Sequence, residues 1–490
     1  MQTIDFVVFA VFTLGVVFFG CSFFKKGSSA EEFAHAGRSL PGWVVGMSIF
    51  ATYVSSISYI GYPGKAFATN WNAFVFSLSI PLAAFLAARY FVPFYRYSGS
   101  VSAYTFLEEK FGRWARLYAS ACYLLTQIAR MGSILYLLAM PMHILMGWDM
   151  VAVIIATSAL VIIYSMMGGL KAVIWADAIQ GIILIGGALL CLGILMFSMP
   201  EGPLQTFQLA IDATEGNKFS LGSFSTSLTE STFWVCLIYG IFINLQNYGI
   251  DQNYVQRYHT AKSLRAARFS VLFGGYLFIP VSALFFLIGT ALYSYYADGV
   301  APLPHSIAEH PDYVFPYFIV SSLPVGLRGL LIASIFAAGM STISTSVTSA
   351  ATVILTDYVQ PYHNTLRSPL TTLRISSVAI GVLGALTAIA MLGVKSIVDA
   401  WWILSSIFSG GMLGLFLLGI MPRRIGRGAA LVGCLAGIVV IAWISLSSII
   451  GLPGPHLHEY LAIVLGTTTI FCIGFLTAFL TNSKRPQRNN

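Results

Sequence analysis

An arginine, an aspartate and a cluster of hydroxyl side chains lie inside long apolar runs of this 490-residue chain, where polar groups are costly. Arg130 is in the middle of the run 123–138, and Asp177 is in the run AVIWADAIQGIILIGG. Residues 341–349 contain seven hydroxyl side chains in nine positions. A guanidinium is a fork of donors that matches a carboxylate, whereas clustered oxygens suit a hard cation such as sodium. These residues therefore indicate the binding of charged species rather than bond-breaking chemistry.

The composition shows what surrounds these groups. The chain is 57% hydrophobic and 9% charged, whereas soluble domains carry about 25% charged residues. So few charges could not cover a soluble fold of this size, and the sequence predicts an all-α membrane protein with one membrane domain, 1–490. A helix needs about 20 apolar residues to cross a bilayer. Thirteen stretches qualify: 5–24, 42–64, 71–95, 115–146, 150–168, 172–199, 232–251, 269–297, 326–356, 372–393, 400–420, 428–451 and 460–481.

The basic residues predict the orientation, because cytoplasmic loops are enriched in Lys and Arg. With the N-terminus outside and the C-terminus inside, 21 of the 26 Lys and Arg residues fall in inside loops. Only Lys65, Lys218, Arg328 and Lys395 fall outside, and Arg130 is within a span. The net charge of +8 is thus a topology signal, and it predicts no nucleic-acid partner.

The span order is compatible with two inverted five-helix repeats, 42–199 and 232–420. An additional helix at 1–26 would precede them, and two helices at 428–481 would follow. Transporters built in this way bind solute near the middle of the bilayer, where the first helix of each repeat is broken. The region around Ser55 and Ser58 is rich in hydroxyls, glycine and proline, which predicts a break in the second span.

The seventh span is also expected to be interrupted, at Gly240, Asn244, Gln246, Asn247 and Gly249. The alternative is that these small and amide residues only pack helices together.

The hydroxyl cluster has a helical arrangement. Ser341, Ser344, Thr345 and Thr348 follow the spacing of one helix face. Hydroxyls in a span can bond back to the preceding turn, which accounts for one or two of them but poorly for seven. Ser341 and Thr342, together with backbone carbonyls of a broken facing helix, would form an oxygen cage for sodium.

The two intramembrane charges leave several interpretations open. Asp177 can bind a cation, carry a proton, or pair with Arg130, and such a buried carboxylate is functional by default. Arg130 can meet Asp177, backbone carbonyls, or a carboxylate of the solute. If Asp177 and the hydroxyl face hold sodium, Arg130 is left for an acidic solute.

Other protein classes are disfavoured. The chain contains no GxxxxGK[ST] motif of an ATP-driven pump, no HExxH metalloprotease motif and no GxSxG hydrolase elbow. The sequence therefore predicts that the protein is not an enzyme.

Four motifs, in order, resemble the sodium:solute symporter family along nearly the whole chain. They are EEFAHAGRSLPGW, GGLKAVIWADAIQ, DQNYVQRYHTAKS and AAGMSTISTS. Within the family, TQIAR, YGIDQNYVQRY and GKAFATNW are similar to the bacterial sialic acid transporters. The resemblance implies the inverted-repeat fold known as LeuT-type and a place in the bacterial cytoplasmic (inner) membrane. It also implies sodium-coupled import of a small acidic sugar, with no oligomer required.

The resemblance also implies site residues. A first sodium ion would be held by Ala51, Val54, Ala338, Ser341 and Thr342, and a second by Asp177, Ser344 and Thr345. The solute would be bound by Ser55, Ser58, Ser77, Arg130, Asn244 and Asn247. Those transporters place a glutamine where this chain has Ser77 and an aromatic residue where it has Ala73, so the solute pocket differs. A symporter for a neutral sugar or a small monocarboxylate, and a sodium-permeable channel or sensor, remain alternatives.

Overall fold

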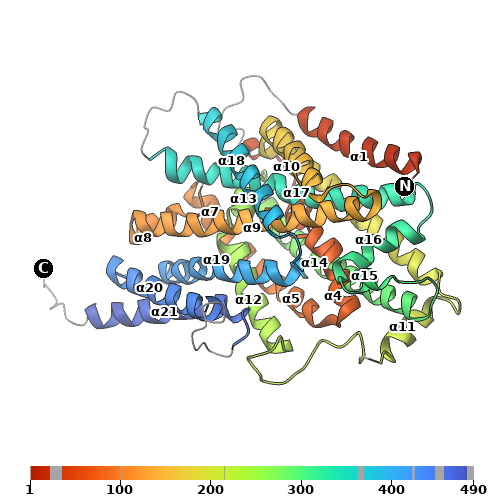
Figure 1. Ribbon diagram of the computed structural model, residues 1–490. Helices are drawn as coiled ribbons and strands as arrows, with labels where there is room; N and C mark the ends of the chain where they lie inside the picture. The colour runs from red at the N-terminus through yellow and green to blue at the C-terminus, as the bar shows by residue number, and fades with distance from the viewer. Residues whose placement is uncertain are drawn as a thin grey trace, which may run out of the picture.

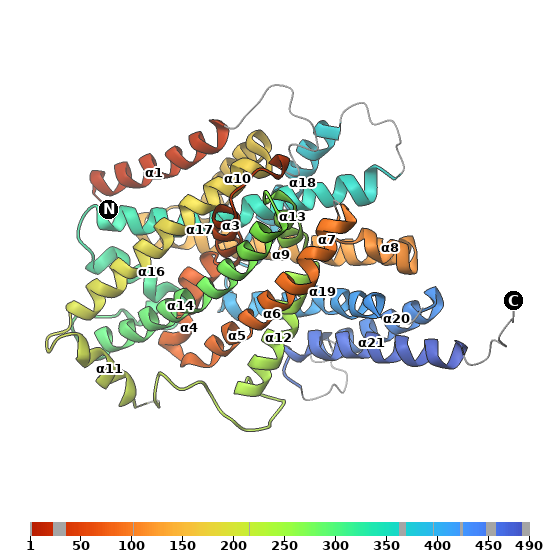
Figure 2. The same ribbon diagram turned by 180° about the vertical axis from the view of Figure 1, so that it is seen from behind.

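The computed structural model describes residues 2–22, 36–100, 102–214, 216–361, 369–394, 396–421, 425–446 and 457–482. All of its named elements are helices, and the long ones are packed side by side (Figure 1). The start of α1 (Thr3–Ser22) and the end of α21 (Leu461–Asn482) lie at opposite ends of the bundle, as both views show (Figure 2).

The predicted spans correspond to helices. Among the described residues, ten helices are long and apolar enough to cross a membrane, and one bent pair makes an eleventh. Two shorter apolar helices, Thr3–Phe19 and Met150–Ile163, match the predictions that remain. The main helices are α9 (Arg113–Met146), α10 (Met150–Phe197), α12 (Phe233–Ile250), α14 (Leu264–Ala297), α17 (Leu327–Val353), α18 (Pro369–Ala390), α19 (Ile397–Ile420) and α20 (Arg427–Leu446).

The span predicted at 71–95 is a chain of short helical pieces that ends at Ser98. It comprises α5 (Val75–Leu78), α6 (Ile80–Leu86) and α7 (Val92–Ser98), joined by a π-helical turn at Ala87–Phe91. By contrast, α10 is continuous over two predicted spans, 150–168 and 172–199. At about 1.5 Å per residue its 48 residues would extend about 72 Å, more than twice the hydrocarbon thickness of about 30 Å. Its apolar parts, Met150–Ile163 and Leu170–Phe197, correspond to the two predicted spans.

The second span is broken where we expected it to be. Helix α3 (Gly42–Tyr53) ends at Val54, whose backbone is extended. A π-helical turn (Ile57–Gly61) leads into α4 (Tyr62–Ala68), and the two halves are bent by 57°. Gly61 and Pro63 weaken the regular helix here, because glycine costs backbone entropy and proline lacks a hydrogen-bond donor.

The predicted interruption inside the seventh span is wrong. Helix α12 is continuous, and the chain breaks only at Asp251, before α13 (Gln252–Thr260). Two of the residues that we took for breakers, Gly240 and Asn244, pack helices together instead. A Cβ at Gly240 would lie 2.7 Å from the Ser79 hydroxyl, and Asn244 donates a 2.8 Å hydrogen bond to that same hydroxyl. Small and amide residues allow such close approach between helices.

Helix α17 is the centre of the bundle. From Leu331 to Val353 all its side chains are buried, and it packs against α1, α9, α10 and α18. It also contacts α3, which brings its hydroxyl-rich segment to the broken end of that helix. The short helices α11 (Pro203–Ile211), α15 (His305–Ala308) and α16 (Pro311–Ser322) lie at the end of the bundle where α1 begins (Figure 1).

Candidate functional site

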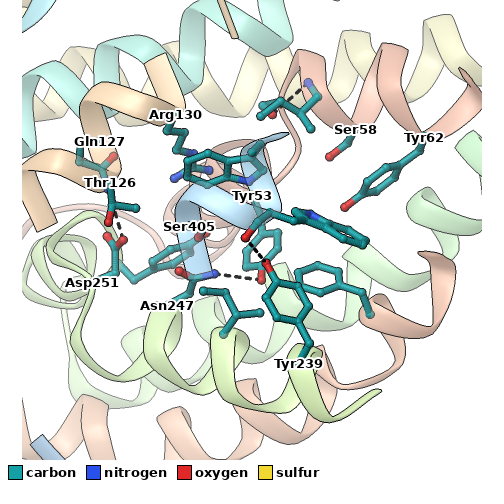
Figure 3. Close-up of a pocket in the computed structure, with 17 residues that line it drawn as sticks. Tyr53, Ser58, Tyr62, Thr126, Gln127, Arg130, Tyr239, Asn247, Asp251 and Ser405 are labelled. Atoms are coloured by element: carbon teal, nitrogen blue, oxygen red, sulfur yellow. Dashed lines mark hydrogen bonds between the residues drawn. The ribbon is translucent and has the colours of Figure 1, made fainter. Parts of the chain in front are cut away.

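A cavity lies where the broken second span meets α9, α12, α13 and α19 (Figure 3). Its lining combines hydroxyl, amide, aromatic and charged side chains, as a pocket for a polar organic solute requires. The lining residues are Tyr53, Ser55, Ile57, Ser58, Tyr62, Phe76, Thr126, Gln127, Arg130, Tyr239, Ile243, Asn247, Asp251, Tyr254, Trp401, Trp402 and Ser405.

Four of the six predicted solute-binding residues are in this lining: Ser55, Ser58, Arg130 and Asn247. The other two lie beside it and bond to neighbouring helices. Ser77 shares a 2.8 Å hydrogen bond with Ser282, and Asn244 is bonded to Ser79. A solute-binding role for these two residues stays a prediction.

Arg130 reaches the cavity from α9 and is 9% exposed. Its guanidinium donates a hydrogen bond to the backbone carbonyl of Thr52, at the end of α3. The sequence left three partners open for Arg130, and the structure shows one of them, a backbone carbonyl. Asp177 is not the partner, because its carboxylate is paired with Arg257 at 2.8 Å. A guanidinium has five N–H donors, so Arg130 retains capacity for a ligand.

Rings form one wall of the cavity. Phe76 and Trp402 have ring centroids 5.1 Å apart, and Tyr239 lies 5.6 Å from Trp402. Tyr460 stacks on Tyr239 at 5.0 Å, although it is not in the lining itself. Aromatic faces of this kind bind the apolar faces of a sugar ring or a short carbon chain.

The first predicted sodium ligands are gathered around the end of α3. Ser341 donates to the carbonyl of Ala51 over 3.1 Å, and Thr342 donates to the carbonyl of Ala338 over 3.2 Å. Thr342 also lies 3.5 Å from the Ala51 carbonyl. Val54, the fifth predicted ligand, directly follows α3. Two hydroxyls and two carbonyls thus lie close together, and such a set of neutral oxygens is of the kind that a hard cation prefers.

The second predicted sodium ligands surround a guanidinium. Arg257 donates to Asp177 over 2.8 Å and to Thr345 over 2.7 Å. Ser48 donates to the same Asp177 oxygen over 2.6 Å, whereas the other oxygen, Oδ1, is buried without a hydrogen-bond partner. Ser344, the third predicted ligand, donates to the carbonyl of Ser341. Asp177 and Thr345 are thus held together by a cation that belongs to the protein.

Sequence reasoning missed several of these residues. We counted Arg257 as a loop residue, but it lies in α13 and its side chain is fully buried. The signal for Thr126 and Gln127 was available, because they precede Arg130 by four and three positions and share its helix face. Asp251 also had a signal, being a carboxylate at the end of an apolar span. Trp401, Trp402 and Ser405 had none, since only the fold brings α19 to the cavity.

A broken central helix, hydroxyls next to its backbone carbonyls and a cavity with a buried arginine are features of secondary transporters. The chain belongs to the sodium:solute symporter family, whose profile matches residues 33–437. The protein is therefore a transporter and not an enzyme, and sodium is its co-transported ion.

The relatives agree with this assignment. The sodium/sialic acid symporter SiaT of Proteus mirabilis is 32% identical over 97% of this chain and 95% of its own length. Human sodium-coupled monocarboxylate transporter 2 is 30% identical, over 91% of this chain and 73% of its own length. A solved structure of a substrate-bound, outward-open Na⁺-coupled sialic acid symporter superposes with a TM-score of 0.89 at 31% identity, and 98% of each chain is covered. The architecture is the LeuT-type fold that we expected, shared with further solved transporters of lower identity.

Proposed function

We propose that this protein imports N-acetylneuraminate, a sialic acid, together with two sodium ions across the bacterial cytoplasmic membrane. Its N-terminus would lie outside, its C-terminus inside, and a single chain would suffice. The observation that carries the proposal is Arg130, a guanidinium in the cavity whose described partner is a carbonyl rather than a carboxylate. This guanidinium keeps N–H donors that can bind the carboxylate of the solute in a bidentate way.

The cycle couples three ligands through the broken helix. Sodium between Ala51, Val54, Ala338, Ser341 and Thr342 would pin α3 to α17. Thr52, which accepts the hydrogen bond of Arg130, belongs to the same end of α3 as Ala51. Sodium binding would therefore fix the arginine that receives the solute. Asp177, Ser344 and Thr345 would hold the second ion, with Arg257 moving aside from Thr345.

The energetics favour uphill import. Two sodium ions and one monoanion carry one net positive charge, worth about 2.3 kcal/mol per 100 mV of membrane potential. A tenfold sodium gradient adds about 1.4 kcal/mol per ion. Together these terms support accumulation of the solute by several powers of ten.

The test is uptake of labelled N-acetylneuraminate into proteoliposomes, with and without an inward sodium gradient. We expect uptake to require sodium and to rise when the interior is made negative. Arg130→Lys removes the fork and should raise the KM for the solute about tenfold to a hundredfold, because charge-assisted hydrogen bonds are lost. Arg328→Lys, at the end of the bundle near α1, is the matched control.

Two outcomes would overturn the assigned solute. If N-acetylneuraminate does not enter while lactate does, the chain is a sodium-coupled monocarboxylate transporter, as the human relative is named. If galactose enters instead, and Arg130→Lys has no effect, the solute is neutral. Sodium flux that does not depend on any solute would indicate a channel.

A further inference from the structure

Asp251 is the second charged residue in the lining of the cavity, beside Arg130. It occupies the break between α12 and α13, where its backbone is extended. One carboxylate oxygen accepts a 2.8 Å hydrogen bond from the backbone N–H of Asn253 and so caps α13. The side chain is 3% exposed, and Figure 3 shows it on the same side of the cavity as Arg130. Nothing in the proposed cycle gives this carboxylate a task.

The other oxygen of Asp251 has only a weak described contact. Gln127 donates to it over 3.4 Å, near the limit of a hydrogen bond. Gln127 is itself fixed, because its carbonyl accepts from Asn253 over 3.0 Å and from Ser346 over 2.8 Å. The amide therefore has little freedom to move toward Asp251. An acceptor oxygen at the cavity wall is thus available to a ligand.

The described salt bridges do not include Asp251, although the charges of Arg130 and Arg257 lie close enough to attract its carboxylate. None of these salt bridges joins it to Arg130, and the nearby guanidinium of Arg257 is engaged by Asp177. When a solute carboxylate occupies Arg130, the negative charge of Asp251 stays buried beside a second negative charge. Such an arrangement is costly unless the solute brings a hydrogen-bond donor to Asp251.

We propose that Asp251 is a specificity-determining residue that accepts a hydrogen bond from a hydroxyl next to the solute carboxylate. The solute class is then the 2-hydroxycarboxylates, with the carboxylate on Arg130 and the hydroxyl on Asp251. N-acetylneuraminate belongs to this class, because its ring carbon 2 bears both groups. The inference rests on the proposed function for the identity of the solute, but it is testable without it. A carboxylate that lacks the hydroxyl is rejected, because it leaves Asp251 without a donor.

The experiment compares pairs of ligands that differ only in this hydroxyl. Inhibition of sodium-dependent uptake is measured for N-acetylneuraminate against its 2-deoxy analogue, and for lactate against propionate. We expect the wild-type protein to prefer the hydroxylated member by about tenfold to a hundredfold, as for a charge-assisted hydrogen bond. Asp251→Asn removes the charge and retains an N-cap, and it should reduce the preference to a few-fold.

The controls separate specificity from folding. Asp149→Asn makes the same change at the exposed N-cap of α10, where Asp149 accepts from Ala152, and should leave both preferences unchanged. If Asp251→Asn does not fold, Asp251→Ser provides a second N-cap without the carboxylate.

Three results would overturn the inference: no preference in the wild-type protein, equal weakening of both ligands in Asp251→Asn, or stronger inhibition by alanine than by lactate. Stronger inhibition by alanine would mean that the Asp251 carboxylate binds an ammonium group of the solute rather than a hydroxyl. If N-acetylneuraminate is not transported, the proposed function fails, whereas the lactate and propionate pair still decides the role of Asp251.

Discussion

Two buried arginines of this protein have opposite surroundings. Arg257 has a carboxylate, two hydroxyls and a carbonyl within hydrogen-bond distance: Asp177, Ser48, Thr345 and the carbonyl of Asn253. Arg130 faces a cavity, and its described hydrogen bond goes to the Thr52 carbonyl. The first arrangement neutralises its charge within the protein, whereas the second leaves the charge for a ligand. Burial alone therefore does not distinguish a structural charge from a binding charge; the partners do.

The same contrast separates the two halves of the hydroxyl face of α17. Ser341 and Thr342 lie next to backbone carbonyls, and no cation of the described residues is bonded to them. Thr345, one turn further on, already accepts a hydrogen bond from Arg257. A sodium ion at the first position meets only oxygens. At the second position it must compete with a guanidinium, so the second site should be the weaker one.

Removing Arg257 is the change from which we expect the largest effect. Arg257→Met leaves the Asp177 carboxylate buried without its cation, which costs about 3–5 kcal/mol of stability when a buried pair is broken. The measurement is the melting temperature of the purified protein in detergent, with Arg130→Met as the matched variant. Arg130→Met should lower the melting temperature less, because the nearest carboxylate, Asp251, forms no described salt bridge with Arg130 and keeps its hydrogen bond from the Asn253 N–H.

The double variant Arg257→Met/Asp177→Asn provides the control for this prediction. It removes the stranded charge and should recover part of the lost stability. Equal melting temperatures for Arg257→Met and Arg130→Met would contradict the distinction between the two arginines.

Much of the fold could be predicted from the sequence because a bilayer imposes simple rules. Every spanning helix must be apolar over a fixed length, so each hydrophobic run that we predicted corresponds to a helix, although two of these helices are shorter than a full span. The break at Val54 was also predictable, because the hydroxyl-rich segment around Ser55 and Ser58 directly follows it and is poor helix material. The break at Asp251 was not, since Asn244 and Gly240 look equally disruptive and are instead used to pack α12 against its neighbours.

The site was predictable only in part, because charge pairing depends on the tertiary structure. Arg130 and the hydroxyl face stand out inside apolar runs, and their types led to the predictions of anion and sodium binding at these residues, which stay predictions. Arg257 follows a span and resembles an ordinary inside-loop residue in the sequence, and only the folded structure packs α13 against α3. Its partner Asp177 is 80 positions away in the sequence, and the hydropathy pattern does not indicate which distant residues form pairs.

Substituting the hydroxyls tests the comparison between the two halves of α17. Ser341→Ala or Thr342→Ala removes one ligand from a cage of neutral oxygens, and we expect the half-maximal sodium concentration for uptake to rise about tenfold. Thr345→Ala should raise it less, and should instead make the dependence of uptake on sodium less steep.

Thr352→Ala is the control for this series, because the Thr352 hydroxyl bonds back to Thr348 on the same helix. The measurement is initial uptake over a range of sodium concentrations at fixed ionic strength. If Thr345→Ala shifts the sodium requirement more than Ser341→Ala, the order of the two sites is reversed.

The smallest effect that we predict concerns Asp312, a buried carboxylate outside the membrane spans. It lies on α16 and accepts a 3.1 Å hydrogen bond from the backbone N–H of Ile397. No described ion pair involves it, unlike Asp177. Burial, with a smaller contribution from the charge of Asp399, raises the pKa of Asp312 to about 7.

The direction of the pH effect follows from this raised pKa. The pKa of an aspartate in the unfolded chain is about 3.9, so the folded protein holds a proton that the unfolded chain has lost. The stabilisation is complete below the unfolded pKa and is lost as the pH rises through about 7. Between about pH 6 and about pH 8 the loss amounts to about 1 kcal/mol. Asp312→Asn should abolish this part of the pH dependence of the melting temperature. If the wild-type protein and Asp312→Asn show the same slope, the carboxylate has a cation in solution, and the contrast with Asp177 does not extend to it.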